Sequence, residues 1–410
     1  MVQRVIAIGL IYSCISGAWL ILGQTIHLRT LEQDDKLKDA VGQLWGTAQT
    51  QRAPQIYRVD RITRIETGAQ GESISRSVDE KRFLSLKSSR IDVDLSLEHR
   101  RKGLLWYSTY HVRFAASYTV SNPTGEYLTL HFDLGLPAHR AVYDDFALSV
   151  DSLRIADVPI RAGHLVHPID LAPGQAVPVH VSYRSRGMEQ WRYSFGEDVN
   201  QVTDFELVMQ TDFAAIDFPS DSVSPTSKTR TGDAWTLKWR YEHLLTGVDL
   251  GMIMPGRLNP GPWVRQVVFA APISLFLYFF QLIIFTTVRH IELHPMHYVF
   301  IGAAYFSFHL LLAYLVDHML IHYAFAFASA VSIFLVTSYM RLVVGTRLAF
   351  VEIGAGQFIY LVLFSYTFFF SGYTGLAITM LCIATLFAAM QFTGRADWNA
   401  VFDREAARSA

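Results

Sequence analysis

The chain has 410 residues and a formal net charge of -1, and 51% of its residues are hydrophobic while only 17% are charged. A net charge near zero, without a block of like charge, gives no field that attracts nucleic acid, so we expect no nucleic acid partner. The charged share is below the roughly 25% of a soluble domain, yet long charged stretches separate the apolar runs. These proportions predict a membrane protein that also carries a large soluble part.

The N-terminal segment predicts an uncleaved membrane anchor. After Arg4 comes an apolar run of about 18 residues that ends in Trp19-Leu20-Ile21-Leu22, whereas a cleaved signal has an apolar region of roughly 7 to 15 residues followed by small residues. A cleaved signal peptide is the alternative. Gly9, Ser13 and Gly17 recur every fourth residue, and such a stripe lets another helix approach closely, so we expect it to pack against the C-terminal helices.

The segment after the anchor becomes polar and then alternates. Leu37, Val41, Leu44 and Trp45 fall at helical spacing, which predicts an amphipathic helix that continues from the anchor and ends at Pro54. Beyond it the hydrophobic period changes to two, as in β-strands. We therefore assign residues 1–26 to the anchor and residues 27–262 to a soluble domain that contains this helix and a β region.

The clearest strand pattern runs from Trp106 to Val120, where the even positions are mostly apolar and the odd positions mostly polar. Residues 121–126 contain Asn-Pro-Thr-Gly, a turn sequence, and the alternation resumes over residues 128–134. The two segments predict a β-hairpin.

Further alternating segments lie at residues 146–150, 177–183, 205–209 and 235–241. No amphipathic helix interrupts them, and a proline and glycine turn precedes the second, so the region predicts an all-β, sandwich-like domain. Its length suits one large sandwich or two smaller ones.

The C-terminal part contains five apolar runs. They lie at residues 267–288, on both sides of the Asp317-His318 corner between His294 and Arg341, at 349–370 and at 373–392. Each is long enough to cross a hydrocarbon core of roughly 30 Å, and at that depth such runs must be helical to satisfy their backbone groups. The fold class is therefore a polytopic α-helical membrane protein with six transmembrane helices and a β-sandwich-like domain between the first and second. Residues 263–398 form the bundle and residues 399–410 a tail.

The distribution of arginine predicts the orientation in the membrane. One side carries Arg4, Arg289, Arg341, Arg347, Arg395 and Arg404, whereas the corners at Asp317-His318 and Ser371-Gly372 on the other side contain no Lys or Arg. The positive-inside rule then places both termini in the cytoplasm. The β domain is expected outside it, which in a Gram-negative cell is the periplasm.

The C-terminal half resembles the CreD family of bacterial inner-membrane proteins. The resemblance rests on His294-Pro295, Tyr298, Gly302, Asp317-His318, Tyr339, Arg341, Gly345 and Arg395-Ala-Asp397-Trp398, and upstream on Trp45-Gly46, Gln49 and Pro54. It covers roughly residues 267–398, the β region is divergent, and the corner acid is Asp where the family pattern has Glu. The resemblance implies a role in cell-envelope integrity or the envelope-stress response, and it implies no reaction.

Polar residues inside the bundle are the candidate functional residues. His309 and Asp317 share a helix face at spacings of four, which gives a polar track of about 12 Å that would relay protons or line a cavity. The alternative, which we prefer, is a neutral His309 that hydrogen-bonds a neighbouring helix.

Asp317, His318 and His322 lie at the outer corner of the central hairpin. Two histidines four residues apart have a spacing that suits zinc or copper, but no HExxH motif accompanies them. We expect no metal there and a structural corner, in which Asp317 caps the following helix. We likewise expect no metal at His290, His294 and His297 on the cytoplasmic side.

Glu352 lies early in the fifth helix, and we expect it to pair with Arg347 or Arg341. The β region contains no GxSxG, P-loop, GxGxxG or cysteine nucleophile. We therefore predict no enzyme, no catalytic residues and no cofactor.

Two functions remain after the enzyme is set aside. In the first, the bundle anchors the protein in the lipid bilayer and the β domain binds an envelope protein or a cell-wall component. In the second, the protein is a transporter or lipid-handling protein that uses the track from His309 to Asp317.

Overall fold

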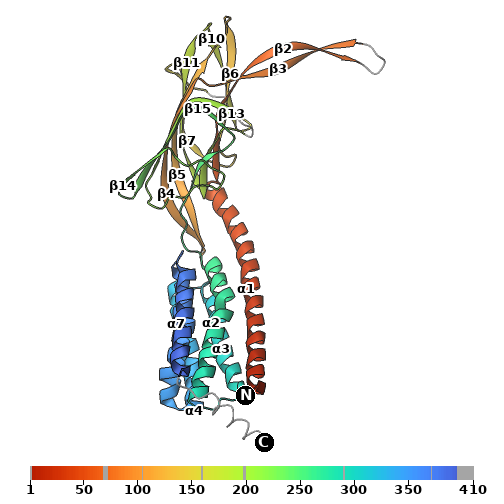
Figure 1. Cartoon of the computed structure of the whole chain (residues 1–410). Coiled ribbons are helices and arrows are strands. Elements are labelled where there is room, and N and C mark those ends of the chain that lie inside the picture. Colours follow the sequence, from red (N-terminus) through yellow and green to blue (C-terminus); the bar gives the residue numbers. More distant parts are fainter. Residues whose placement is uncertain are drawn as a thin grey trace. The chain divides into compact units, whose positions relative to one another are not determined.

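The computed structural model describes residues 2–67, 73–103, 105–157, 160–196, 200–289, 291–370 and 372–394 (Figure 1). The chain divides into two compact units, one comprising Met1–Asp35 and Leu258–Ala410 and the other Lys36–Arg257. The expected tail at residues 399–410 and the motif that begins at Arg395 lie outside the described residues. So does His290.

Six segments of the described residues are long and apolar enough to cross a membrane, as the hydropathy predicts. Five are regular helices: α1 (Val2–Trp45), α2 (Pro260–Val288), α3 (Pro295–Leu315), α4 (Ile321–Val344) and α7 (Thr374–Thr393). The sixth, Leu348–Phe369, is irregular. The fold is therefore a polytopic membrane protein with a large β domain between its first two membrane helices, as expected.

The irregular span alternates wide and ordinary helical turns. It consists of η1 (Leu348–Ile353) and η2 (Phe358–Leu363), which are π-helical, then α5 (Gly354–Gln357), α6 (Phe364–Tyr366) and the 3-10 turn η3 (Thr367–Phe369). In a π-turn the backbone bonds run from residue i to i+5, which bulges the helix and shifts its carbonyl groups. The hydropathy of this span does not reveal these turns.

Helix α1 ends at Trp45, earlier than the expected end at Pro54. The residue that follows, Gly46, has a φ of 115°, a conformation that a residue with a side chain rarely adopts. Its N–H still bonds to the Gly42 carbonyl at 2.9 Å and closes the last turn. The stop is therefore a glycine cap, and Pro54 lies beyond the short strand β1 (Gln49–Arg52).

The expected packing face of α1 is wrong. Gly9 and Ser13 are exposed, and the face that packs on the bundle carries the large side chains Ile8, Trp19, Leu22 and Ile26. The small residue at this contact belongs to α3, because a Cβ on Gly302 would overlap the Ile15 side chain of α1. The two helices thus approach closely because the Ile15 side chain of α1 packs over a glycine of α3.

The β unit contains three sheets, and its strands after β1 are β2 (Gln55–Thr67), β3 (Ser73–Leu84), β4 (Ser88–Lys102), β5 (Leu105–Ser121), β6 (Leu128–Gly135), β7 (Tyr143–Val150), β8 (Leu153–Ile155), β9 (Ile160–Arg161), β10 (His164–Leu171), β11 (Ala176–Met188), β12 (Gln190–Ser194), β13 (Asn200–Thr211), β14 (Ser227–Thr231), β15 (Ala234–Thr246) and β16 (Leu250–Ile253). The eight-stranded sheet has the order β14-β15-β13-β4-β5-β11-β7-β8, the five-stranded sheet β3-β2-β6-β10-β9 and the three-stranded sheet β1-β12-β16. All three contribute to one hydrophobic core, so the domain is a single sandwich-like unit.

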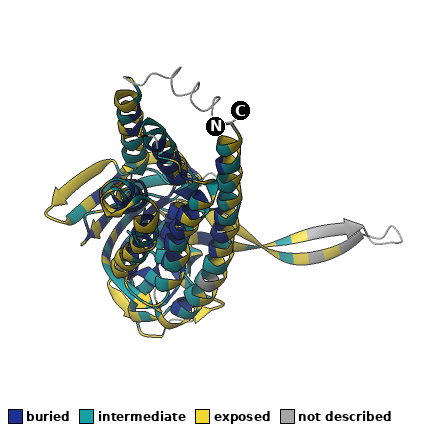
Figure 2. Cartoon of the chain, turned by 90° about the horizontal axis from the view of Figure 1, so that it is seen from below, coloured by how far each residue is buried: buried dark blue, intermediate teal, exposed yellow. Residues whose placement is uncertain are grey.

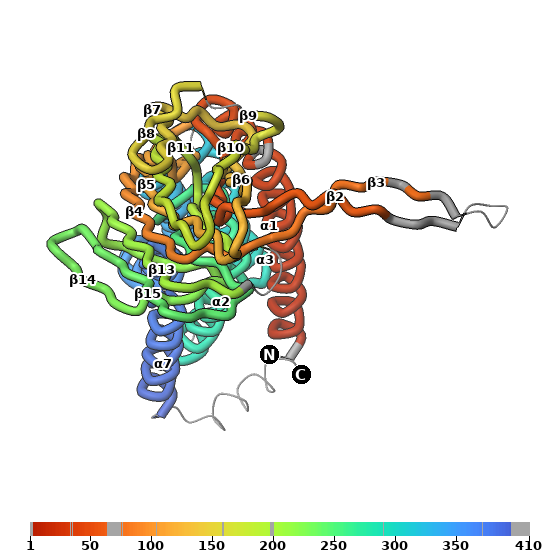
Figure 3. The backbone as a smooth tube through the Cα atoms, turned by 90° about the horizontal axis from the view of Figure 1, so that it is seen from above, coloured from red at the N-terminus to blue at the C-terminus, as the bar shows by residue number. Residues whose placement is uncertain are grey.

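One hairpin, formed by β2 and β3, projects from the β domain (Figure 3), and we call it the arm. Residues 79–83 of the arm are exposed one after another, and because successive strand residues point to opposite faces, both faces are exposed there (Figure 2). The sequence pattern did not predict these two strands.

The expected hairpin between residues 106–120 and 128–134 is also wrong. Strand β5 pairs with β4 and β11, whereas β6 pairs with β2 and β10 in the five-stranded sheet. The apolar faces of β5 and β6 meet across the core, where the rings of Tyr118 and Phe132 lie 6.0 Å apart. Alternation was right about which face is buried, but it carries no information on which strands pair.

The connection between β5 and β6 is held by the buried side chain of Asn122. Its amide nitrogen lies 2.8 Å from the Glu126 carbonyl, 3.1 Å from the Leu171 carbonyl and 3.2 Å from the Ala172 carbonyl. Its side-chain oxygen accepts from the Thr124 N–H at 3.0 Å. One amide thus satisfies backbone groups from two separate segments where the chain changes sheets.

Replacement of Asn122 by Ala should lower the free energy of unfolding of the β domain by about 1–3 kcal/mol, because buried carbonyls lose their donor. Denaturant unfolding of the purified full-length protein, followed by its β-sheet circular dichroism, measures this change. Ser121→Ala is the control and should change stability by less than about 0.5 kcal/mol. Equal stability of the two variants would contradict the role of Asn122.

Candidate functional site

The polar track of α3 lies against helix α1. Trp19 of α1 makes an edge contact with the His309 ring, with centroids 5.3 Å apart, and a second with Tyr305 at 6.1 Å. His309 is only 1% exposed. Ala313 follows one turn further along α3, and Asp317 lies two residues beyond the end of that helix. Helix α1 therefore covers the expected face at His309, and the track continues into the corner after α3.

The His309 ring bonds within its own helix. Its Nδ1 lies 3.2 Å from the Tyr305 carbonyl, so the expected bond to a neighbouring helix is not the one observed. Among the described residues, Nε2 of His309 and Nε1 of the adjacent Trp19 are both buried without a hydrogen-bond partner. Burying two ring nitrogens without hydrogen bonds in an apolar interface costs free energy, so this is the least satisfied polar position of the track.

The other end of the track is an ion pair with α1. Arg29 Nη1 lies 2.9 Å from Asp317 Oδ2, and its Nη2 donates to the Ala313 carbonyl at 3.0 Å. The guanidinium also lies over the Tyr314 ring, 5.6 Å from its centroid. Arg29 therefore satisfies an end carbonyl of α3 and neutralises the corner acid together.

The expected capping role of Asp317 is wrong. Helix α4 begins at Ile321, its N-cap residue is Leu320, and no side chain caps it. The sequence signal that was missed is Arg29 itself, a single cation just beyond the apolar run of α1, at the level of a single acid in the corner of the bundle.

The two histidines of the corner do not converge with Asp317 on a shared centre. His318 and His322 are exposed, and the ring of His322 stacks on Phe369 of η3 with centroids 4.8 Å apart. No group of three or more His, Cys, Asp or Glu side chains that would hold a metal occurs in the described part of the chain. The corner is thus built by stacking and by the ion pair of Asp317.

Glu352 pairs with Arg289, whose Nη2 lies 3.7 Å from Oε1, and the expected pairing with Arg341 or Arg347 is wrong. Arg289 is the residue that ends α2, and Glu352 lies in the π-turn η1, where the wide turn changes the direction of side chains. Arg341 lies exposed in the last turn of α4. Glu352 and Arg341 therefore belong to different contacts.

A buried hydroxyl network, which the sequence did not indicate, joins the irregular span to the bundle. Tyr305 donates to the Tyr360 carbonyl at 2.7 Å, Ser274 donates to the same carbonyl, and Tyr278 donates to the Ile353 carbonyl at 3.0 Å. The carbonyls belong to the two π-turns. The π-turns and the hydroxyl groups thus complement each other.

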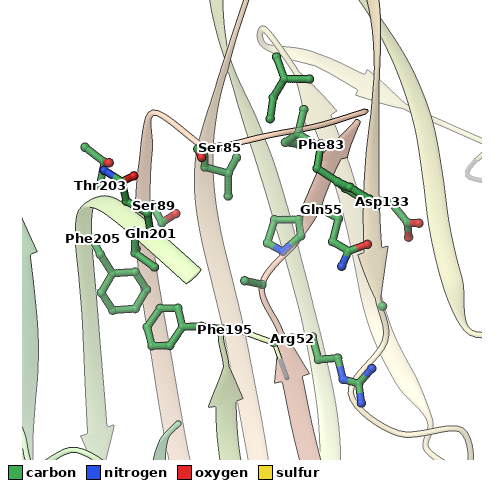
Figure 4. A pocket seen from close by; sticks show the side chains of 18 of the residues that line it. Arg52, Gln55, Phe83, Ser85, Ser89, Asp133, Phe195, Gln201, Thr203 and Phe205 are labelled. Atoms are coloured by element: carbon green, nitrogen blue, oxygen red, sulfur yellow. The ribbon is translucent and has the colours of Figure 1, made fainter. Parts of the chain in front are cut away.

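A second candidate site is a cleft of about 710 Å³ in the β domain, a size typical of ligand sites. Figure 4 shows Gln201, Thr203 and Phe205 on one side, and Gln55, Phe83 and Asp133 on the other. Its inner end is aromatic, since the rings of Phe195 and Phe205 lie 5.0 Å apart and that of Tyr193 lies 5.5 Å from Phe195. Burial raises the pKa of the Tyr193 hydroxyl, so it stays neutral.

The rim of the cleft is polar. His164 Nδ1 lies 2.8 Å from Asp133 Oδ1, and Gln55, Ser85 and Thr203 also line it. An aromatic end together with several polar side chains suits binding of a chain that carries both apolar and polar groups.

A family model described as inner membrane protein CreD matches residues 265–399. The match begins inside α2 and covers the helices that follow, the part of the chain in which the motif residues were found. No curated protein matches the chain.

Similarities to solved structures are weak. A proposed nutrient binding protein from Legionella pneumophila is 10% identical with a TM-score of 0.31, over 57% of this chain and 76% of that chain. An M1 zinc metallopeptidase from Deinococcus radiodurans is 12% identical with a TM-score of 0.27, over 75% of this chain and 92% of that chain. A mutant of an M1 zinc metallopeptidase from the same organism is 15% identical with a TM-score of 0.27, over 41% of this chain and 42% of that chain. These scores carry no argument about fold or function.

The pair between Arg29 and Asp317 gives a direct test of the seam between α1 and α3. Arg29→Asp and Asp317→Arg should each destabilise the purified protein in detergent, and the double swap should recover about 0.5–1 kcal/mol relative to the sum of the single changes. Thermal unfolding measures the coupling.

The matched control is the fully solvated arm pair of Arg61 and Asp79, whose side chains are 77% and 58% exposed. The same swap there should show almost no coupling, because water screens the charges. Equal coupling energies for the two pairs would mean that the Arg29 pair is an ordinary surface contact.

Proposed function

We propose that this chain, whose bundle is similar to inner membrane protein CreD over residues 265–399, is a multi-pass inner membrane protein of that kind and acts as a non-enzymatic protein of cell-envelope integrity or the envelope-stress response. In this proposal the bundle holds the protein in the lipid bilayer. The β domain lies in the periplasm and binds another envelope component, a protein or a part of the cell wall.

The arm carries this proposal. A two-stranded ribbon is marginally stable at best in water, and residues 79–83 of this one have no support from the rest of the domain on either face. Val59 and Phe83 are 45% and 59% exposed on it. Ile56 at the base of the ribbon belongs to the core of the domain, but residues 79–83 do not. An outer part of a ribbon that lies outside the core is a candidate interaction element, and exposed apolar residues on it favour a macromolecular partner.

The orientation rests on the ends of the membrane helices. Arg4 near the start of α1, Arg289 at the end of α2, and Arg341 and Arg347 around the end of α4 support cytoplasmic termini by the positive-inside rule. The same rule supports a periplasmic β domain.

A conduit is the second candidate, and His309 is the observation that favours it. Among the described residues, Nε2 of His309 is buried without a hydrogen-bond partner, and so is the indole nitrogen of the adjacent Trp19. The two nitrogens mark a polar spot deep in the bundle. Against it, Asp317 is held by Arg29, so the end of the track is neutralised rather than open.

Shortening of the arm tests the first function. In the full-length protein, residues 60–80 are replaced by Asn-Gly, a tight turn, at the position where Asp60 and Glu80 lie directly opposite each other. We expect normal abundance and membrane insertion but loss of envelope function, measured as survival of a deletion strain in detergent or cell-wall antibiotics.

The control for arm shortening is the exposed turn between β14 and β15, where Gly232-Asp233 is replaced by Asn-Gly. This change should leave survival at the wild-type level. Full function of the shortened arm would remove the main support for the proposal.

Replacement of His309 distinguishes a scaffold from a conduit. Asn in its place still donates to the Tyr305 carbonyl and should leave the envelope phenotype nearly intact, whereas His309→Leu should cost up to about 3 kcal/mol and lower protein abundance. A conduit predicts loss of function for His309→Asn at normal abundance, because an amide does not titrate as imidazole does. Quantitative immunoblots beside the survival assay separate the two outcomes.

A further inference from the structure

The cleft of the β domain forms where one strand leaves the eight-stranded sheet. Strand β4 pairs with β13 from Ser89, opposite Phe205, up to Leu95. The chain before β4, residues 84–87, instead leads to β3 in the five-stranded sheet. Strand β13 extends further in the same direction, to Asn200, and is paired there only with β15.

Residues 201–203 of β13 therefore have a partner on one edge only. Gln201, Val202 and Thr203 pair with Leu245, Leu244 and His243 of β15. On the other edge, no described strand lies beside them. Backbone groups on such an edge are available for an added strand.

An irregular residue separates the free edge from the part of β13 that pairs with β4. The ladder omits Asp204, whose φ is 43°, together with Glu242 opposite it, and the register is the same on either side. Arg90 of β4 clasps this residue, with Nη1 2.6 Å from the Asp204 carbonyl and Nη2 2.6 Å from its carboxylate. The edge at 201–203 is thus held in place at the point where β4 departs.

The free edge borders the apolar part of the cleft. Val202 packs against the core beside the aromatic group of Tyr193, Phe195 and Phe205, and residues 84–86 form the facing wall. Figure 4 shows Gln201 and Thr203 of β13 across the cleft from Phe83 and Gln55. A strand edge beside an apolar cavity is the arrangement by which β-augmentation sites take a peptide, the edge bonding its backbone and the cavity one face of its side chains.

We propose that this cleft binds an extended polypeptide segment, which adds as a strand to the edge of β13 at residues 201–203 and places its alternate apolar side chains in the cavity. The proposal rests on the proposed function of the β domain and names the class of its partner, a protein rather than a glycan. An acyl chain would fill the cavity but has no donor or acceptor for the backbone edge, and a glycan lacks the regular N–H and C=O spacing of a strand.

The test uses the full-length protein in nanodiscs and a fluorescent nine-residue peptide panel. One set alternates Val or Leu with Ser or Lys, and a second has the same composition without alternation. The third set consists of two versions of the best alternating peptide, in which every second backbone amide is N-methylated. One version is methylated on one edge of the strand and the other version on the opposite edge. Fluorescence anisotropy should show binding of alternating peptides, a loss of at least tenfold without alternation, and a loss of at least tenfold when one of the two edges is methylated. Equal binding of both methylated peptides would overturn strand addition.

Variants locate the site. Val202→Asp and Leu86→Asp, on facing walls, should each weaken binding at least tenfold, while Leu153→Asp, at an exposed position of β8 on the same sheet, should leave it unchanged. Circular dichroism verifies that each variant is folded. If Val202→Asp does not fold, Val202→Thr, which keeps shape and adds a hydroxyl, should still reduce affinity several-fold.

Other occupants are direct outcomes of the same assay. Binding of a fluorescently labelled soluble cell-wall glycan fragment or fatty acid, with no binding by any peptide, would overturn the proposal while leaving an envelope partner in place. Loss of envelope function on arm shortening, with no effect of Val202→Asp on survival or on peptide binding, would retain the proposed function and refute the cleft. If peptides bind in the cleft but the protein with the shortened arm keeps full envelope function, the cleft proposal would stand and the proposed role of the arm would be refuted.

Discussion

Backbone hydrogen bonding is the constraint on which this structure depends. Every N–H and C=O that leaves water needs a partner, and within a bilayer only a helix supplies partners along its whole length. Six spans meet this requirement. In the β domain the ladders of three sheets meet it. The places where the requirement is met by other means, or is left open, are the places that we connect with function.

Where the fifth span widens into π-turns, side chains of neighbouring helices supply hydrogen bonds to its backbone carbonyls. The carbonyls of Ile353 and Tyr360 accept from hydroxyl groups of α2 and α3. Gln357, between the two π-turns, bonds Ser332 of α4 at 2.8 Å. The irregular span is thereby joined to α2, α3 and α4 through hydrogen bonds in an apolar medium, where an unpaired group costs most.

In the β domain the same constraint acts at two of the points where the chain changes sheets. After β5 the crossing is closed, because Asn122 supplies bonds to the carbonyls of the turn and of residues 171 and 172. Before β4 the crossing leaves one edge of β13 without a described strand beside it. The connection after β5 stabilises the domain, and the connection before β4 leaves the cleft that we assign to a partner.

The sequence by itself determined properties that are local or summed along the chain. Hydropathy predicted the number of spans, alternation predicted the buried face of β5, and the motif residues lie in the part of the chain that the CreD model matches. It did not determine partners, because partners are brought together by tertiary packing: the pairing of Asp317 with Arg29 joins the first membrane helix to the corner after the third. The same holds for Glu352 with Arg289, and for β6, which pairs outside the sheet of β5. Hydrophobic periodicity and charge specify which face of a helix or strand is apolar. Only the fold decides which other helix or strand packs against that face.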